Sequence, residues 1–280
     1  MTPSTAQTAA SPTKLAEDAP PQSQRGEWTW ELVTLFPRQG DWSEEEYLSR
    51  EFDGLVEFTN GVLEFLHRVP EDEGGPPPSE RGDWTWELLA QYPRQGEWLE
   101  SSYLALESNQ LIEFRDGMLE FLPMVTPLHQ DLLMFLRDQL VAATQGRYPG
   151  RVYVAPLRVR LRNGLYREPD VTFAKPEHVP ERRRPLTGAE LVMEIVSGAA
   201  SDRHRDFVAK RADYAESGIR EYWIVDPDLE TITVLTLPEF KSEYVVRGRF
   251  QKGDIAMSAL FPEFMIDVTS CFAAGLTPPT

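Results

Sequence analysis

An internal duplication in the first half of the sequence restricts how this chain can fold. Three blocks of residues recur in the same order 56 residues later, with few substitutions. The blocks at 25–32, 37–42 and 55–66 return at 81–88, 93–98 and 111–122. Similarity this dense over about 45 residues indicates a duplicated structural unit, whereas a solenoid needs three or more repeats. We therefore predict two copies of one small unit rather than a repeat array.

Each copy is predicted to contain a short helix followed by a β-hairpin. Residues 43–48 and 100–106 have helical patterns, and each is followed by two alternating apolar runs around a turn. The turns are Asn60-Gly61 in the first copy and Asp116-Gly117 in the second, which are sequences typical of tight hairpins. The Trp-Thr-Trp segments of the two copies are either core anchors or an exposed aromatic binding surface, and we favour burial.

Charge is distributed unequally along the chain, whose net charge is −17. Residues 1–125 hold 8 Lys and Arg against 24 Asp and Glu, whereas residues 126–280 hold 20 against 21. The acidic front half argues against a polyanionic partner there, while the back half carries basic clusters. Arg158, Arg160 and Arg162 occupy alternate positions, which on a strand project from one face. That face is either simply solvated or available to a nucleic acid.

Composition also indicates the compartment. The single cysteine, Cys271, excludes an internal disulfide and a cysteine-rich zinc site, so a reducing cytosol is expected. No apolar run approaches the roughly 18 to 20 residues of a membrane span, and the N-terminus lacks the order of a secretory signal. We therefore expect a cytoplasmic protein with no membrane partner. Homo-oligomerisation is left open.

The second half of the chain alternates strand-like and helical patterns, which predicts an α/β fold. The expected elements are a helix capped near Thr126, strands at 151–161, 169–174 and 190–196, a helix at 202–217 closed by Gly218, and strands at 221–226 and 231–235. A strand, a helix and another strand within so few residues favour a right-handed parallel crossover.

Three residues within these elements could carry chemistry. Asp170 opens one apolar strand and Glu194 ends another, and a carboxylate in such a run is costly to bury without a partner. Two carboxylates on neighbouring strands favour a shared cation such as Mg²⁺. Lys210 lies on the apolar stripe of the helix, where it is either a structural lysine or one that leans back toward the carboxylates.

Taken in order, these residues resemble a known family. Pro169-Asp170, Glu194-Ile-Val-Ser197, Lys210 and the run 221–227 look like the Uma2 family (DUF820) of bacterial proteins, over about residues 98–270. That family belongs to the restriction-endonuclease-like PD-(D/E)XK superfamily. The resemblance implies an αβββαβ core with a mixed sheet, preceded here by the duplicated helix–hairpin segment.

The resemblance also implies a function and a set of site residues. Asp170 and Glu194 would bind Mg²⁺ or Mn²⁺, and with Lys210 they would catalyse hydrolysis of DNA phosphodiester bonds. The superfamily's lysine normally lies two residues after the acid, where this chain has Val196. Lys210, supplied by the helix, is the expected replacement.

The expected domain limits follow from the repeat and the resemblance. They are a disordered tail at 1–24, the first repeat copy at 25–75, a linker at 76–80, a nuclease-like domain at 81–272 that begins with the second copy, and a tail at 273–280.

The sequence leaves open the roles of some residues and the choice between alternative functions. His129, at a helix start, and Glu113, which has a counterpart in Glu57, are second-rank site candidates. The residues 202–205 look like a solvated helix start. The rival hypothesis is a catalytically inactive nuclease-fold protein that acts as a protein-interaction or regulatory module. A third hypothesis combines the nuclease and the interaction module. In it, the acidic first copy acts as a DNA mimic that occupies the basic face of the second half.

Overall fold

A computed structural model describes residues 19–275, apart from 67, 107, 109, 182 and 198–202. The chain forms two compact units, of which the smaller comprises Met1–Gln110 with Asp116–Phe121 and the larger Leu111–Arg115 with Leu122–Thr280. Three predicted segments lie wholly or partly outside the described residues: most of the N-terminal tail, residues 276–280 of the C-terminal tail, and the helix start at residue 202.

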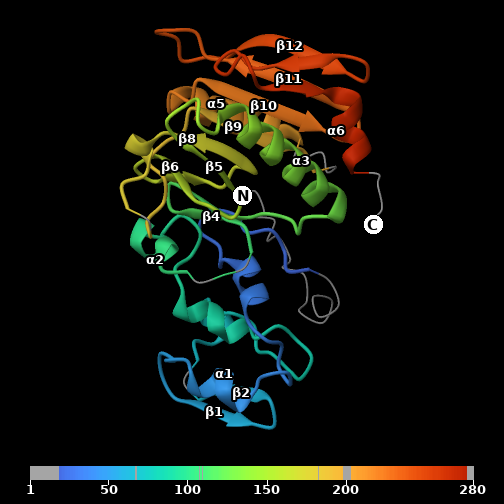
Figure 1. Cartoon of the computed structure of the whole chain (residues 1–280). Coiled ribbons are helices and arrows are strands. Elements are labelled where there is room, and N and C mark those ends of the chain that lie inside the picture. The colour runs from blue at the N-terminus through green and yellow to red at the C-terminus, as the bar shows by residue number, and fades with distance from the viewer. Residues whose placement is uncertain are drawn as a thin grey trace, which may run out of the picture. The chain divides into compact units, whose positions relative to one another are not determined.

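A six-stranded mixed sheet forms the centre of the larger unit (Figure 1). Its strands follow the order β12-β11-β10-β9-β8-β5. Their bounds are β5 (Arg151–Val154), β8 (Val171–Ala174), β9 (Leu191–Ile195), β10 (Glu221–Asp226), β11 (Thr231–Thr236) and β12 (Val245–Gln251). Strands β9 and β10 are parallel and the other neighbouring pairs are antiparallel. The parallel connection predicted on either side of the helix is therefore confirmed.

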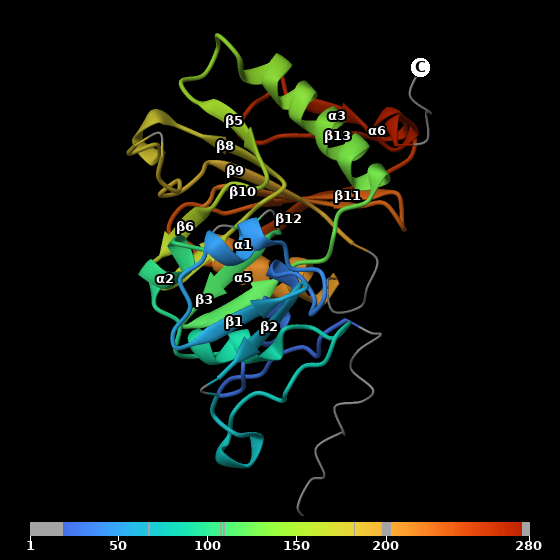
Figure 2. The ribbon, with the colours of Figure 1, turned by 90° about the horizontal axis from the view of Figure 1, so that it is seen from below.

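Helices cover both faces of this sheet. Helices α3 (Pro127–Thr144) and α6 (Val268–Ala274) lie on one face with the strands β13 (Ile255–Met257) and β14 (Met265–Asp267), and α5 (Lys210–Glu216) lies on the other (Figure 2).

Strand β9 shows how the sequence builds this arrangement. Its odd-numbered apolar residues join the core under α3, whereas Val192 and, just beyond the strand, Val196 join the core under α5. This division follows because successive strand side chains point to opposite faces. The order α3, β5, β8, β9, α5, β10 is the predicted αβββαβ core. None of the helices in the described part of the chain is long and apolar enough to cross a membrane.

A second sheet has the order β4-β3-β7-β6. Its strands are β3 (Ile112–Arg115), β4 (Met118–Phe121), β6 (Val159–Arg162) and β7 (Leu165–Arg167). The single strand predicted over 151–161 is wrong, because β5 and β6 belong to different sheets. Pro156 lies between them, and it lacks the amide hydrogen that a strand ladder requires.

The arginines of β6 also depart from the prediction. The strand register shifts between Arg160 and Arg162, so these two residues pair with the consecutive residues Tyr166 and Leu165. A bulge of this kind turns their side chains to opposite faces. Arg160 and Arg162 therefore do not share one basic face.

The smaller unit contains the first repeat copy and most of the second, and the predicted helices and hairpins of both copies are present. The first copy has the 3₁₀ helix η2 (Trp30–Leu35), helix α1 (Glu44–Leu48) and strands β1 (Val56–Thr59) and β2 (Val62–Phe65). The second has η4 (Trp86–Gln91), α2 (Glu100–Leu104) and then the β3–β4 hairpin, through which the division between the two units passes. Two further short 3₁₀ helices are η3 (Glu71–Glu73) and η5 (Pro176–His178). Both hairpin turns have positive φ at their two central residues, as an Asn-Gly or Asp-Gly turn requires.

The Trp-Thr-Trp segments are partly core and partly surface. Thr29, Thr85 and Trp86 are buried, whereas Trp28 and Trp84 are half-buried. The prediction that these segments are buried is therefore confirmed for the two threonines and only in part for the tryptophan rings. Ser23, which falls within the expected tail at 1–24, accepts a hydrogen bond from the Trp30 amide at 2.8 Å.

Candidate functional site

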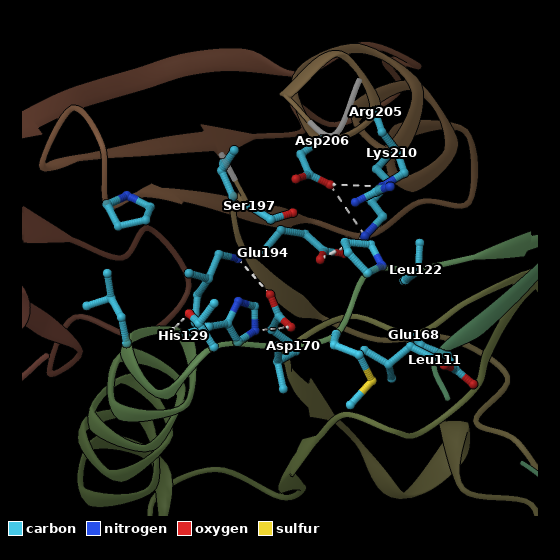
Figure 3. A pocket seen from close by; sticks show the side chains of 18 of the residues that line it. Leu111, Leu122, His129, Glu168, Asp170, Glu194, Ser197, Arg205, Asp206 and Lys210 are labelled. Carbon is cyan, nitrogen blue, oxygen red and sulfur yellow. Dashed lines mark hydrogen bonds and ion pairs between the residues drawn. The ribbon is translucent and has the colours of Figure 1, made fainter. Parts of the chain in front are cut away.

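The two predicted metal ligands lie beside each other at the ends of two neighbouring inner strands of the central sheet, Asp170 just before β8 and Glu194 within β9. In the antiparallel pair β8–β9, Val171 is opposite Met193. Continuing this register by one residue places Asp170 opposite Glu194. Both carboxylates line a cavity of about 250 Å³ (Figure 3). Their side chains are 7% and 4% exposed, so the pair is desolvated.

Asp170 is held by two donors from different elements. Its Oδ1 lies 2.9 Å from His129 Nε2, and its Oδ2 accepts a 2.7 Å hydrogen bond from the Ile195 amide. His129 occupies the first turn of α3, whose cap is Thr126, as predicted; the Thr126 hydroxyl accepts from the His129 amide at 3.2 Å. The structure thus places His129, a second-rank candidate, in direct contact with a predicted ligand.

Lys210 reaches the carboxylates from the opposite side of the cavity. Its Nζ lies 2.9 Å from Glu194 Oε2, 3.4 Å from Asp206 Oδ1 and 3.6 Å from Glu113 Oε1. The lysine side chain is 2% exposed. Val196, which occupies the superfamily's usual lysine position, is buried in the apolar core under α5. The structure therefore brings Asp170, Glu194 and Lys210 together, with the ammonium supplied by the helix.

Asp206 is a cavity residue that the sequence reasoning missed. It precedes Lys210 by one helical turn, and the five residues Arg205–Ala209 form a π-helix immediately before α5. Wider turns of this kind are frequent at functional sites. Asp206 is 2% exposed, and its Oδ1 forms ion pairs with Lys210 and Arg205 but accepts no hydrogen bond among the described residues. The i, i+4 spacing to Lys210 on one helix face was the available signal.

The helix start is only in part the predicted solvated segment, because His204 is exposed whereas Arg203 and Arg205 form ion pairs. Arg203 pairs with the buried Asp226, and Arg205 is only 14% exposed, with its Nε 3.7 Å from Asp206 Oδ1. Arg205 lines the same cavity as the two carboxylates. The prediction failed for these two arginines because a run of charged residues before a helix gives no indication of buried acids that pair with it. Asp202 lies outside the described residues.

Glu113, the other second-rank candidate, anchors a buried ion network behind Lys210. Its carboxylate contacts the Arg167 guanidinium and accepts a 3.0 Å hydrogen bond from the Glu168 amide. Arg167 also reaches Asp213 at 2.7 Å. Glu113 does not line the cavity, so it contributes to the site by fixing Lys210 from behind.

Charge in this cluster is unbalanced. Burial raises the pKa of Glu194, and although Lys210 opposes the shift, the neighbouring carboxylates add to it and bring the pKa to about 8. Burial likewise raises the pKa of Asp206. Burial alone would raise the pKa of Glu113, but Lys210 and Arg167 outweigh it and hold the pKa at about 2. Because Arg167 pairs with Glu113, the cavity itself has the two cations Lys210 and Arg205 beside the three carboxylates of Asp170, Glu194 and Asp206.

This imbalance fits a bound cation at Asp170 and Glu194. Among the described residues, no three His, Cys, Asp or Glu side chains converge closely enough to enclose a metal ion. Two carboxylates are nevertheless a fitting set for Mg²⁺, which usually retains several waters and binds through one or two carboxylates plus substrate phosphates. Each carboxylate oxygen here already has a protein donor, yet a carboxylate offers about four lone-pair sites, so room for a cation remains.

Comparisons with known proteins agree with this fold. A crystal structure described as a "putative nuclease belonging to DUF820" from Anabaena variabilis matches with a TM-score of 0.51 and 16% sequence identity. The match covers 62% of this chain and 97% of the other. No curated protein matches the sequence. The model of the Uma2 family, described as "Putative restriction endonuclease", matches residues 100–269. That range covers the αβββαβ core and the cavity residues, and the chain therefore belongs to the Uma2 family.

Proposed function

We propose that the protein is a Mg²⁺- or Mn²⁺-dependent endonuclease that hydrolyses phosphodiester bonds of DNA, with Asp170, Glu194 and Lys210 at its active site. The observation that carries the proposal is the convergence of these three side chains at one cavity, Asp170 from the residue before β8, Glu194 from β9 and Lys210 from α5. Membership of a family described as "Putative restriction endonuclease" supports the reaction class.

Asp170 and Glu194 are the residues proposed to hold the cation. Bound there, Mg²⁺ would polarise a phosphate oxygen and lower the pKa of a coordinated water. His129 and the Ile195 amide fix the two oxygens of Asp170, so this carboxylate is oriented before any ligand arrives. Such preorganisation is what positions a reacting group without cost at the moment of reaction.

Lys210 is proposed to act as a cationic donor rather than as a base. Burial by itself would lower the pKa of Lys210, but Glu113, Glu194 and Asp206 outweigh it and raise the pKa above its usual value. The ammonium therefore stays protonated. From this position it can donate to a phosphate oxygen or orient the attacking water as negative charge develops. Arg205 adds a second cation to the lining of the cavity.

The test is cleavage of supercoiled plasmid by purified protein with Mg²⁺ or Mn²⁺, with chelator as the blank. Asp170→Asn, Glu194→Gln and Lys210→Met should each lower the rate by about a hundredfold or more, because each removes a group that acts on the transition state. Matched controls are Glu216→Gln, on the exposed face of the same helix, and Lys241→Met, also exposed; both should cleave like the parent chain.

Two outcomes would overturn the proposal. Cleavage that persists in Asp170→Asn and Glu194→Gln would remove the site assignment. Absence of cleavage of any DNA by folded parent protein with either metal would instead favour the catalytically inactive interaction module.

A further inference from the structure

The two repeat copies of the smaller unit are joined by contacts that occur in matched pairs. Trp42 Nε1 of the first copy donates to Thr85 Oγ1 of the second at 3.0 Å. The counterparts of these two residues form the same bond from the second copy to the first. Trp98 Nε1 of the second copy donates to Thr29 Oγ1 of the first at 2.9 Å. All four residues belong to the smaller unit.

The same reciprocity extends along two segments of backbone. Gly82 N donates to Gln39 O at 2.6 Å and Gln39 N to Asp83 O at 2.9 Å. The matching bonds join Gly26 N to Gln95 O at 2.7 Å and Gln95 N to Glu27 O at 2.9 Å. Residues 25–31 thus lie on the second copy, and residues 81–87 lie on the first.

Arginines complete both interfaces in the same way. Arg81 Nη2 donates to Asn60 O at 2.7 Å, and Arg25 Nη2 donates to Asp116 O at 3.0 Å, so each arginine reaches the hairpin turn of the other copy. The Arg38 guanidinium lies 3.9 Å from the ring centre of Trp84, and Arg94 lies 3.9 Å from that of Trp28. Contacts of this kind between a guanidinium and an indole are attractive.

Glycine is required where these arginines cross the other copy. Gly96 has a φ of +97°, and a Cβ there would lie 2.6 Å from Arg25 Nη1. Its counterpart Gly40 has a φ of +104°, and a Cβ there would lie 2.8 Å from Arg81 Nη1. The positive φ favours glycine at both positions, and an arginine of the opposite copy occupies the space beside each of them.

The two copies also meet through equivalent side chains. Trp30 packs edge-on against its own counterpart Trp86, with ring centres 5.8 Å apart, and Phe36 packs against its counterpart Tyr92 at the same distance. Contact between equivalent residues is the mark of a two-fold interface. A tandem repeat of independent units would instead repeat contacts within each copy.

We propose that residues 25–31 and 81–87 are exchanged docking segments, so that the smaller unit is a two-fold pair built inside one chain, in which the first copy takes the place of a second subunit. Each copy presents a surface that accepts one specific partner: an Arg-Gly-acidic-Trp-Thr-Trp segment from another copy. The first copy is therefore needed to complete the second, whose own Trp98 and Gln95 are otherwise left without their cross-copy partners.

The direct test is nuclear magnetic resonance of the tryptophan indole N–H groups in the full chain. Thr29→Val should shift the indole signal of Trp98 and speed its hydrogen exchange while leaving that of Trp42 in place. Thr85→Val should do the reverse. Because the two substitutions are identical in chemistry, each serves as the control for the other. Shifts confined to the tryptophan of the same copy would overturn the proposal.

A second measurement covers the case in which the signals overlap. In a double-mutant cycle, Thr29→Val with Trp98→Phe should change the unfolding equilibrium constant by about fivefold less than the product of the single effects, because both remove one hydrogen bond. The control pair within one copy, Thr29→Val with Trp42→Phe, should be multiplicative. Coupling in the control pair and none in the cross-copy pair would contradict the exchange.

Discussion

The two hairpins of the repeat have nearly the same sequence and very different surroundings. Glu57 in β1 and Glu113 in β3 occupy the same position of the repeat. Glu57 is exposed and lies opposite another acid, Glu64, in its two-stranded sheet. Glu113 is 1% exposed and touches Arg167 and Lys210. The same residue is thus a surface acid in one copy and part of a buried ion network in the other.

The difference arises from the residues that surround each hairpin. The repeat supplies the hairpin twice, but Arg167, Asp213 and Lys210 occur once, in the larger unit. Beyond Phe121 the second copy continues into α3 and the central sheet, whereas the first continues into η3 and the second copy. A duplicated segment therefore acquires a role at a site only where the rest of the chain provides ion partners for it.

The largest expected effect separates these two acids. Glu113→Gln should lower the free energy of unfolding by about 4 kcal/mol, because it leaves the buried charges of Arg167 and Lys210 without a counterion. Glu57→Gln, the matched change at an exposed position, should stay within about 0.5 kcal/mol. Urea denaturation of both variants measures this. Equal effects would show that the buried network does not stabilise the larger unit.

A smaller effect should be shared by the two copies, because one part of the repeat keeps the same surroundings. Leu63 and Leu119 are 3% and 4% exposed. Each exchanges two hydrogen bonds with the side chain of a glutamine of its own copy, Gln39 or Gln95. Leu63→Ala and Leu119→Ala should each cost about 3 kcal/mol. Calorimetric unfolding that gave clearly unequal losses would contradict the equivalence of the copies.

The smallest expected effect concerns pH. The pKa of Glu194 is raised to about 8 from an unfolded value of 4.5, so in cation-free protein its contribution to stability is present below pH 4.5 and is lost as pH rises through about 8. Cation binding needs the carboxylate form, so the affinity for Mn²⁺ should rise about tenfold from pH 6 to pH 7, with release of a proton.

Isothermal titration calorimetry in buffers of different ionisation enthalpy measures the affinity for Mn²⁺ and the number of protons released on binding. The Glu194→Gln variant should bind Mn²⁺ much more weakly, and the pH dependence of its affinity for Mn²⁺ should largely disappear. An affinity for Mn²⁺ that stays constant between pH 6 and pH 8 in the parent chain would show that Glu194 is not a ligand.

Much of the fold could be predicted from the sequence, because its signals are local. The Asn-Gly and Asp-Gly turns, the cap at Thr126 and the alternation within β9 each act over a few residues. The break at Pro156 and the bulge after Arg160 were missed, because pattern alone does not say which sheet a strand joins.

The candidate site could be predicted in part. Asp170, Glu194 and Lys210 were found through their order in the chain, and the structure brings them together. Asp206 was missed although it lies four residues before Lys210, and Arg205 was assigned to a solvated helix start although it lines the cavity. A charged residue at the start of a helix does not reveal by itself whether it faces solvent or a buried acid. The exchange between the repeat copies was missed as well, since a repeat reveals that copies exist and not which copy each segment contacts.

The most direct test of the proposed metal site is a crystal of the full chain grown with Mn²⁺, examined by anomalous diffraction at the manganese absorption edge. We predict one strong anomalous peak between Asp170 and Glu194, absent from Asp170→Asn crystals grown in the same way and retained in Glu57→Gln crystals. A peak elsewhere, or none at this pair while the metal saturates other sites, would contradict it.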